Sequence, residues 1–317
     1  MQTIDTRVCA IRFEAENIHS FELRALDDGP LPPFNAGAHV EVRMGTNLRR
    51  SYSLLNDPAE TDRYVIAVQN DAAGRGGSQF MHANVRVGQV LPISAPSNNF
   101  ELVENAPQFV LFAGGIGITP ILSMVHRLER IGKRWSLYYC GRERRLMAYL
   151  GWLRQRKEAG ADIRFHIDAE SGGAHVDIRR IVADAPAGAH FYCCGPKSML
   201  AAFEKATADC APQCVHIEYF APKEEAASAG GFLVELARTK RTLHVIAGKS
   251  ILETLLEANV PVGYSCMEGI CGACEVNVLA GIPDHRDSVL STEERAANNR
   301  IMVCCSGAKS PSLVLDI

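Results

Sequence analysis

Four cysteines toward the end of the chain restrict its fold and chemistry more than any other feature. Cys266, Cys271 and Cys274 are spaced C-x4-C-x2-C, and Cys304 follows after 29 intervening residues. Four thiolates at this spacing are typical of a plant-type [2Fe-2S] cluster, whose two irons need four ligands in all. The sequence therefore predicts an iron–sulfur cluster with these four cysteines as its metal ligands.

The residues around the cysteines fit this prediction, and alternatives remain. Gly269, Gly272 and Ala273 are small enough for a loop to fold tightly around a cluster. A structural zinc site usually has paired C-x2-C units, and buried thiols without a metal are a third interpretation. Cys305 adjoins Cys304. Because neighbouring strand residues point to opposite faces, only one of the two can face the cluster, and the spacing favours Cys304.

The overall charge and the N-terminus narrow the class of protein. The 317 residues carry a formal net charge of −3 with Lys and Arg scattered, so the basic surface of a nucleic-acid-binding protein is not expected. Eleven cysteines without a secretion signal indicate a reducing compartment, and we expect the cytoplasm. The longest uncharged stretch, residues 109–125, is interrupted by glycines and a proline, so no membrane span is expected.

Three parts of the chain differ in pattern, which predicts three domains. Residues 1–104 contain short alternating runs separated by turns, as in an antiparallel β-barrel. Residues 105–225 alternate apolar strands with amphipathic helices, which predicts a doubly wound parallel sheet. Residues 226–231 are small and polar and are expected to form a linker before a third domain over 232–317. The strands expected in the second domain are Phe109–Ala113, Trp135–Cys140, Asp162–Ile167, His190–Cys194 and Val215–Phe220.

A glycine-rich segment follows the first strand of the second domain. Gly114-Gly-Ile-Gly-Ile-Thr-Pro120 leads directly into a helical pattern. Glycines allow a backbone to approach a pyrophosphate, and the N-terminus of a helix favours the negative charge of a phosphate. Such turns also occur where a strand and a helix pack closely, so the segment alone does not decide between nucleotide binding and packing.

A second segment, Cys194-Gly-Pro196, closes the fourth strand of the same sheet. The carboxyl ends of parallel strands border the crevice in which open α/β sheets bind ligands. Cys194 is therefore expected to face a nicotinamide. The alternative is a small buried thiol that only fills space in the core.

Two segments of the first domain have the residues of a flavin site. Arg50-Ser-Tyr-Ser53 supplies a cation for a phosphate, a ring for an isoalloxazine and a hydroxyl for a ring nitrogen. Gly74-Arg-Gly-Gly-Ser78 precedes the helical residues 79–84 and supplies backbone amides for a phosphate. Taken singly, Tyr52 fits a core strand equally well and the glycines fit a simple turn.

Together these motifs resemble the phthalate dioxygenase reductase group of the ferredoxin–NADP reductase superfamily, over essentially the full chain. The segments that carry the resemblance are Arg50–Ser53, Gly74–Ser78, Gly114–Pro120, Cys194–Pro196 and the four cysteines. A C-terminal ferredoxin domain is typical of this group. The resemblance implies a β-barrel that binds FMN, a doubly wound domain that binds NADH and a C-terminal β-grasp ferredoxin domain of the plant type.

The resemblance also implies roles for individual residues. Those implied to bind FMN are Arg50, Tyr52, Ser53, Gly76, Gly77 and Ser78. Those implied to bind NADH are Gly115, Gly117, Thr119, Cys194, Gly195 and Pro196. The catalytic residues would be Ser53 near the reactive flavin nitrogen, Cys194 at the nicotinamide and Phe220, which closes the fifth strand and would cover the flavin where hydride arrives.

The implied activity is a sequence of electron transfers. NADH gives two electrons at once whereas a [2Fe-2S] cluster accepts one, so FMN is needed between them. The resemblance implies that the acceptor is the Rieske-type component of an aromatic-ring oxygenase or O-demethylase, and we expect this chain to be a monomer. A different acceptor, such as a cytochrome or another metalloenzyme, and a redox sensor without turnover are the alternatives.

The choice between NADH and NADPH depends on charges after two strands. Asp168 and Glu170 follow the third strand and would repel the 2′-phosphate of NADPH, whereas Arg142, Arg144 and Arg145 follow the second strand and would attract it. The residues leave both coenzymes open, and the resemblance favours NADH.

Overall fold

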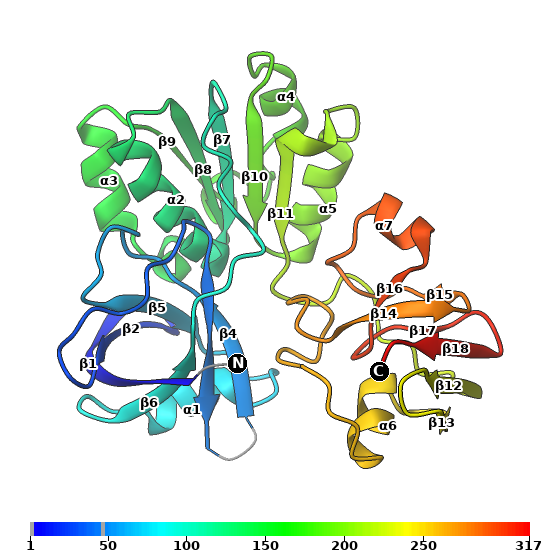
Figure 1. Ribbon diagram of the computed structural model, residues 1–317. Helices are drawn as coiled ribbons and strands as arrows, with labels where there is room; N and C mark the ends of the chain where they lie inside the picture. The colour runs from blue at the N-terminus through cyan, green and yellow to red at the C-terminus, as the bar shows by residue number, and fades with distance from the viewer. Residues whose placement is uncertain (1–2, 46–47) are drawn as a thin grey trace. The chain divides into compact units, whose positions relative to one another are not determined.

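In the computed structural model, which describes residues 3–45 and 48–317, the N-terminal part of the chain is an antiparallel sheet with the strand order β4-β3-β6-β1-β2-β5 (Figure 1). Its strands are β1 (Thr3–Ala15), β2 (Ile18–Ala25), β3 (His39–Met44), β4 (Leu48–Ser53), β5 (Tyr64–Gln69) and β6 (Val90–Ser94). Successive side chains of a strand point to opposite faces, so the sheet has one buried face: Thr6 and Val8 of β1 are buried, whereas Arg7 is exposed. A bridge between Leu54 and Ile66 joins the two ends of the sheet, which closes the predicted barrel.

The second sheet is parallel throughout, with the order β11-β10-β7-β8-β9. Its strands are β7 (Phe109–Gly114), β8 (Trp135–Gly141), β9 (Asp162–Ile167), β10 (His190–Cys194) and β11 (Val215–Glu218). Every residue of β7 is buried, as expected for a central strand that is covered on both faces. Both sheets belong to one compact unit, Met1–Glu218.

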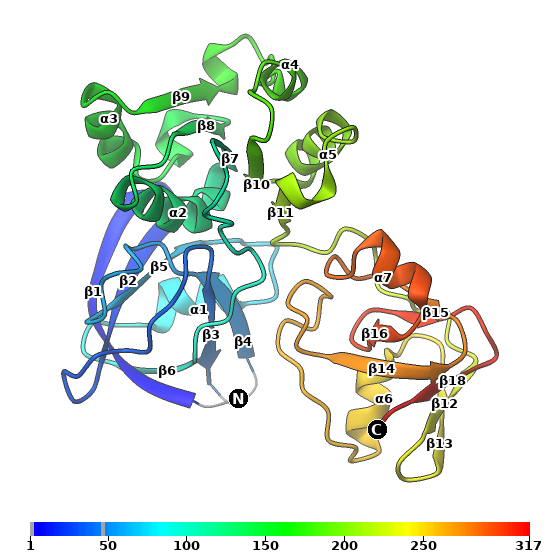
Figure 2. The same ribbon diagram turned by 45° about the horizontal axis from the view of Figure 1, so that its top comes forward.

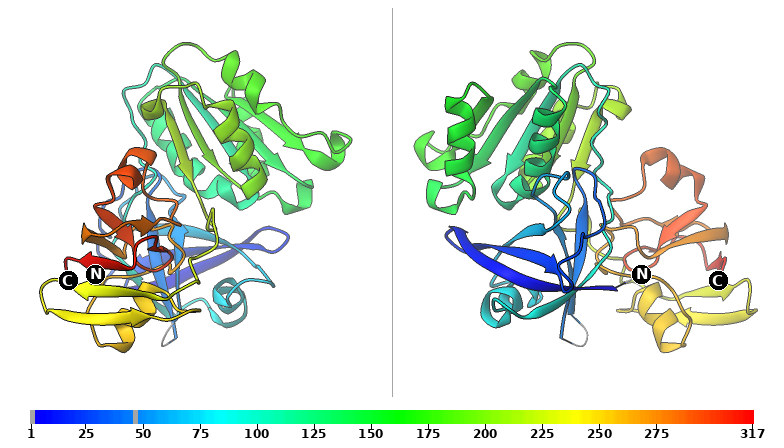
Figure 3. Two further views of the ribbon diagram at one scale, coloured as in Figure 1. Left: turned by 90° about the vertical axis from the view of Figure 1, so that its right-hand side faces the viewer. Right: turned by 60° about the vertical axis from the view of Figure 1, so that its left-hand side comes forward.

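Helices cover both faces of the parallel sheet, as Figures 2 and 3 show. On one face α2 and α3 share a buried cluster with Leu111 and Leu137, and on the other Phe203 of α5 packs edge-on against Phe112. The helices of this unit are α1 (Gly77–Asn84), α2 (Ile118–Arg130), α3 (Leu150–Glu158), α4 (Ile178–Ala183) and α5 (Lys197–Ala206). The doubly wound prediction is therefore confirmed. In the described part of the chain, no helix has the length and hydropathy to cross a membrane.

The second compact unit, Tyr219–Ile317, contains a mixed sheet with the order β13-β12-β18-β14-β16 and a small two-stranded ladder of β15 and β17. Its strands are β12 (Phe232–Leu236), β13 (Arg241–Val245), β14 (Glu275–Ala280), β15 (Pro283–Asp284), β16 (Arg300–Met302), β17 (Gly307–Ala308) and β18 (Ser312–Leu315). The helices α6 (Ile251–Glu257) and α7 (Thr292–Ala297) begin at Ser250 and Ser291, each with a capping box. Residues of α6 pack into the core of the mixed sheet, as predicted for a β-grasp domain.

The fifth strand of the parallel sheet is shorter than predicted, because β11 ends at Glu218. Its partner β10 ends at Cys194, which pairs with Glu218, and the chain then turns at Gly195 and Pro196 into α5. Residues beyond Glu218 therefore have no neighbouring strand with which to bond. Phe220 does not close the strand; it follows it in irregular structure and is 39% exposed.

Candidate functional site

The carboxyl edge of the parallel sheet has the geometry of a ligand site. From β7 the chain proceeds to β8 and β9 on one side, and β10 and β11 lie on the other side, so the strand order reverses between β7 and β10. Open α/β sheets bind ligands at such a reversal. Both α2 and α5 begin at this edge, so the positive ends of two helix dipoles lie beside it.

The two predicted nucleotide segments pack directly against each other at this edge. A Cβ atom on Gly117 would lie 2.3 Å from the carbonyl oxygen of Cys194, and one on Gly114 would lie 2.5 Å from Cδ of Pro196. Close packing therefore accounts for these two glycines. Gly115 is different, because its φ of 54° is left-handed and a Cβ there would have no atom within 4 Å. Among the glycines of these two segments, only Gly115 leaves open space for a ligand.

Thr119 lies in the first turn of α2 and is buried, with 2% of its surface exposed. Its hydroxyl donates a hydrogen bond of 3.0 Å to the carbonyl of Ile116. The side chain therefore stabilises the turn between β7 and α2. A contact of Thr119 with a pyrophosphate, as predicted, would have to come from its backbone or from a rearranged side chain.

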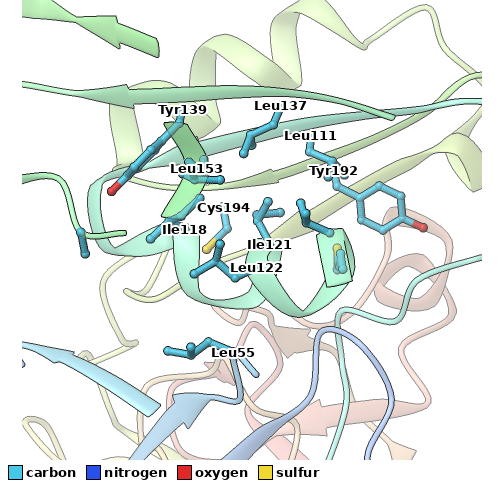
Figure 4. Packing of buried hydrophobic residues seen from close by; sticks show 14 of the residues in the cluster. Leu55, Leu111, Ile118, Ile121, Leu122, Leu137, Tyr139, Leu153, Tyr192 and Cys194 are labelled. Carbon is cyan, nitrogen blue, oxygen red and sulfur yellow. The ribbon is translucent and has the colours of Figure 1, made fainter. Parts of the chain in front are cut away.

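Cys194 is fully buried, and Figure 4 shows its side chain close to Ile118 and Leu122 of α2. Burial raises the pKa of this thiol, and the neighbouring carboxyl of Glu218 raises it further. The thiol therefore stays protonated at neutral pH. This environment agrees with the alternative of a core thiol, and a position against a nicotinamide remains a prediction.

Glu218 is a residue of this edge that the sequence analysis did not identify. Its backbone pairs with Cys194 across β10 and β11, and its carboxyl hydrogen-bonds the Cys194 thiol. Its Oε2 atom is inaccessible to solvent and has no hydrogen-bond partner among the described residues. Burial raises the pKa of Glu218 to about 8, so the carboxyl is largely protonated at neutral pH. The available signal was an acidic residue at the end of an otherwise apolar strand.

The predicted flavin phosphate residues come together at the N-terminus of α1. A Cβ atom on Gly77 would lie 2.5 Å from Cγ of Arg50, so the arginine stem lies directly over this glycine. The Arg50 guanidinium donates to the carbonyl of Arg75 at 2.9 Å. Gly76 has a left-handed φ of 83° as the residue before the helix, and a Cβ there would contact nothing within 4 Å. The cation, the free amides and the open space suit a phosphate.

The other two flavin residues lie on β4 beside Arg50. Tyr52 pairs with Val40 and Ser53 with His39 of β3. Burial raises the pKa of the Tyr52 hydroxyl, and the charge of Arg50 lowers it in part, which places the two side chains near each other. Ser53 ends the strand and is 5% exposed. Ser78, the remaining residue, lies in the first turn of α1, where its hydroxyl accepts a bond from the Asp71 amide at 3.0 Å.

In the second unit, the four predicted cluster ligands are neighbours through three pairs of thiols, Cys266 with Cys271, Cys266 with Cys304 and Cys274 with Cys304. Contacts with Cys271 and then Cys304 lower the pKa of Cys266, and a contact with Cys304 lowers that of Cys274. Backbone amides also point at sulfur, since the amide of Glu268 donates to Cys266 Sγ at 3.3 Å. Donors of this kind stabilise thiolates, so the donor set fits an iron–sulfur cluster.

Cys305 has a different environment from Cys304. Its sulfur lies 3.8 Å from the carbonyl oxygen of Met302 and 2.4 Å from the position that a Cβ on Gly269 would occupy. Gly269 also has a left-handed φ of 70°, so two independent reasons require glycine here. The thiol of Cys305 therefore packs beneath the cysteine loop, whereas Cys304 lies among the other three thiols.

A site for a single metal ion requires a different arrangement of side chains from a cluster site. Within residues 3–45 and 48–317, no three His, Cys, Asp or Glu side chains are grouped so that they could hold a metal ion. A binuclear cluster spreads its four thiolates around two irons and their bridging sulfides, so its ligands do not converge on one point. The arrangement of the cysteines is thus compatible with the cluster that the spacing predicts.

The charged residues after β8 and β9 pair with one another. Arg144 makes a two-pronged ion pair with Glu170, in which Nη2 lies 2.6 Å from Oε2. Arg145 pairs with Glu143 at 2.8 Å and also contacts Glu16 of the barrel. Two of the three arginines that could attract a 2′-phosphate are therefore already bonded to carboxylates.

Comparisons with known proteins agree with this architecture. Residues 111–205 match the family described as oxidoreductase NAD-binding domain, and residues 234–309 match the 2Fe-2S iron-sulfur cluster binding domain. Phenoxybenzoate dioxygenase subunit beta of Ectopseudomonas oleovorans is 50% identical over 318 residues, which cover 100% of this chain and 98% of the relative. Tetrachlorobenzoquinone reductase of Sphingobium chlorophenolicum is 48% identical over 320 residues, covering 100% and 99%. The solved structure of phthalate dioxygenase reductase is 37% identical with a TM-score of 0.76, covering 99% and 98%.

Proposed function

Because the chain belongs to the phthalate dioxygenase reductase family, we propose that it oxidises NADH and passes the electrons singly, through FMN and a [2Fe-2S] cluster, to a Rieske-type oxygenase component. The observation that carries this proposal is the grouping of four thiols in one chain with two further sites. These are the carboxyl edge of the parallel sheet, where α2 and α5 begin, and the phosphate site at Arg50 and the N-terminus of α1. A relative that is similar over its full length is named as a dioxygenase subunit, which supports an oxygenase as the acceptor.

The carboxyl edge of the parallel sheet, which we call the nucleotide edge, would hold NADH through backbone atoms at the starts of α2 and α5. Gly115 is the position at which a pyrophosphate can approach closely, and the N-termini of α2 and α5 favour its charge. Gly117 and Thr119 shape the first turn of α2, and Gly195 and Pro196 shape the first turn of α5. The ion pair with Glu170 occupies Arg144, which could otherwise attract a 2′-phosphate, and Asp168 remains to repel one, which supports NADH as the donor.

In the barrel, Arg50 would bind the FMN phosphate together with the amides of Gly76, Gly77 and Ser78. Tyr52 would lie along the ring system, and Ser53 would donate its hydroxyl to the reactive nitrogen. Bound FMN supplies the exchange between two-electron and one-electron transfer.

Three residues would act where NADH and flavin meet. Cys194 supplies a neutral thiol at the carboxyl edge, and Glu218 holds a proton beside it at neutral pH. Phe220 would cover the flavin where hydride arrives.

The cluster would be held by Cys266, Cys271, Cys274 and Cys304. Cys305 would remain a structural thiol beneath Gly269. The backbone amide bonds to Cys266 Sγ would stabilise the additional electron that the cluster carries during turnover.

The organisation of the chain forms part of the same proposal. We assign residues 1–104 to the FMN barrel, 105–225 to the NADH domain, 226–231 to the linker and 232–317 to the ferredoxin domain. We further propose a cytoplasmic monomer that contacts its oxygenase only transiently.

A second candidate acceptor is a quinone. It is favoured by one observation, the 48% identity over the full length to a tetrachlorobenzoquinone reductase. Quinones accept electrons from reduced flavin and from iron–sulfur centres, so the same cofactors would serve.

An absorbance spectrum and a set of acceptors test the function. Purified protein should show flavin and [2Fe-2S] bands together and should oxidise NADH with ferricyanide, with cytochrome c and with a purified Rieske-type oxygenase in separate assays. Product formation by the oxygenase supports the proposal. Flavin-replete protein that oxidises NADH with a quinone but never reduces the oxygenase would transfer the assignment to the quinone acceptor.

A further inference from the structure

Residues 223–231, which we call the strap, have the composition of a flexible linker but are bonded to the second unit along their length. The amide of Gly231 donates to the carbonyl of Val245 at 2.7 Å, and the carbonyl of Ser228 accepts from the amide of Gly248 at 2.9 Å. These bonds add the strap to the end of the β12–β13 hairpin. The compact unit accordingly begins at Tyr219, upstream of the strap.

The middle of the strap is bonded to the segment that carries the fourth predicted ligand. The amide of Ala227 donates to the carbonyl of Cys305 at 2.8 Å. A Cβ on the buried Gly307 would lie 2.8 Å from Cβ of Ala227, so glycine at that position lets the strap lie close. The peptide between Cys305 and Ser306, one residue beyond Cys304, is therefore held by a bond from the strap.

The start of the strap leads to the loop that carries the other ligands. The amide of Lys223 donates to Ser288 Oγ at 3.3 Å, and the amide of Ser288 donates to the carbonyl of Gly269 at 2.8 Å. Gly269 lies between Cys266 and Cys271 in the chain. Two successive hydrogen bonds thus link the strap to the cysteine loop.

Glu224 forms ion pairs with two arginines, one on the Cys304 side and one on the side of the cysteine loop. Its carboxylate lies 3.3 Å from Arg286 and 3.9 Å from Arg295. The amide of Arg286 donates to Ser306 Oγ at 3.1 Å, on the side of Cys304, and Arg295 donates to the carbonyl of Asp287, on the side of the cysteine loop. One side chain of the strap therefore engages a residue from each side of the cluster site.

We propose that the strap is a clamp for the [2Fe-2S] site and that Glu224 is a positioning residue, which keeps the Cys304 segment and the cysteine loop at the spacing a bound cluster needs. The proposal rests on the proposed function only in that the four cysteines hold a cluster. Glu224 and both arginines are partly exposed, so its effect is modest and concerns retention of the cluster rather than folding.

The test compares Glu224→Ala with Glu225→Ala in the full-length holoprotein. Both remove one carboxylate from adjacent positions, and Glu225 is exposed. We expect E224A to lose the cluster about two- to fivefold faster than E225A when visible absorbance is followed in the presence of an iron chelator. The electron paramagnetic resonance signal of the reduced cluster should shift or broaden in E224A alone. NADH–ferricyanide activity, which needs only flavin, and the thermal midpoint should match in both variants.

A second pair of variants tests the hydrogen bond from the Ala227 amide to the Cys305 carbonyl. Ala227→Pro removes the amide that bonds Cys305, whereas Ala226→Pro leaves it. Loss of a bond to a buried carbonyl predicts at least about fivefold faster cluster loss for A227P than for A226P. Equal cluster loss and identical resonance signals for E224A and E225A overturn the clamp, even if A227P fails to fold. A parent protein that holds no cluster would instead overturn the proposed function.

Discussion

The packing of Gly117 against Cys194 predicts a large effect of the smallest possible substitution, Gly117→Ala. A Cβ at this position would lie 2.3 Å from the carbonyl oxygen of Cys194, 2.5 Å from its carbonyl carbon and 2.8 Å from the Gly195 amide nitrogen. All three are backbone atoms, so no side-chain rotation can relieve the overlap. Ordinary contact begins near 3.4 Å. The two loops must therefore separate by about 1 Å, the difference between 3.4 and 2.3 Å.

The cost of that separation can be estimated. Overpacking of this kind costs roughly 1–3 kcal/mol. For a unit of this size, about 1 kcal/mol lowers the thermal midpoint by roughly 2–4 °C, so G117A should unfold roughly 2–12 °C below the parent. The same movement displaces both loops of the nucleotide edge. Since a misplacement of about 1 Å can cost on the order of 100-fold in rate, kcat/KM for NADH should fall at least roughly tenfold.

Thermal unfolding tests the predicted drop in midpoint, and NADH–ferricyanide kinetics test the predicted fall in kcat/KM. Gly151→Ala is the matched control. Gly151 lies in α3, its φ is not left-handed and a Cβ there would contact nothing within 4 Å. The control should leave NADH kinetics unchanged and raise stability by up to about 1 kcal/mol, because alanine favours helix. A folded G117A protein with the midpoint and the NADH kcat/KM of G151A would refute the reasoning.

Four further outcomes follow from the site. Cys304→Ser should abolish the [2Fe-2S] absorbance while Cys305→Ser keeps it; the reverse result would exchange the ligand assignment. Arg50→Gln should weaken FMN binding at least about tenfold in a fluorescence titration, through loss of a charged hydrogen bond. Glu170→Ala should raise the ratio of NADPH to NADH kcat/KM several-fold, because it frees an arginine. Glu218→Gln should gain in thermal midpoint over the parent between about pH 4.5 and 8: the buried carboxyl titrates near 8 when folded and near 4.5 when unfolded, so the parent loses stability across this window.

Local patterns were sufficient for most elements of the fold. The strands β9 and β10 have the predicted ends: β9 alternates apolar with polar residues, as an edge strand does, and β10 is almost wholly apolar. The end of β11 was wrong, since Tyr219 and Phe220 are good strand residues in isolation. What ends the strand is its neighbour β10, which stops at Cys194 before a proline, and a single segment carries no information about where its partner stops.

The sequence predicted which residues would form the site, but not how buried they are or which side chains surround them. Motif spacing predicted four cysteines as cluster ligands and Arg50 as part of a phosphate site, and in the structure the residues of each set lie near one another. Spacing did not reveal that Cys194 is fully buried or that Glu218 lies beside it. Both facts depend on the pairing register of two strands that are separated in sequence by a helix, which is a property of the assembled sheet.

The same limitation applies to the linker predicted over residues 226–231, which lie within the strap. Small polar residues without periodicity indicate flexibility only when nothing in the rest of the chain can bond their backbone. Here Gly307 leaves room for Ala227 of the strap, whose amide bonds the Cys305 carbonyl, and the Lys223 amide reaches the Gly269 carbonyl through Ser288. Gly269, which was predicted to let the loop fold tightly, is therefore also the residue at which the strap holds the loop through Ser288.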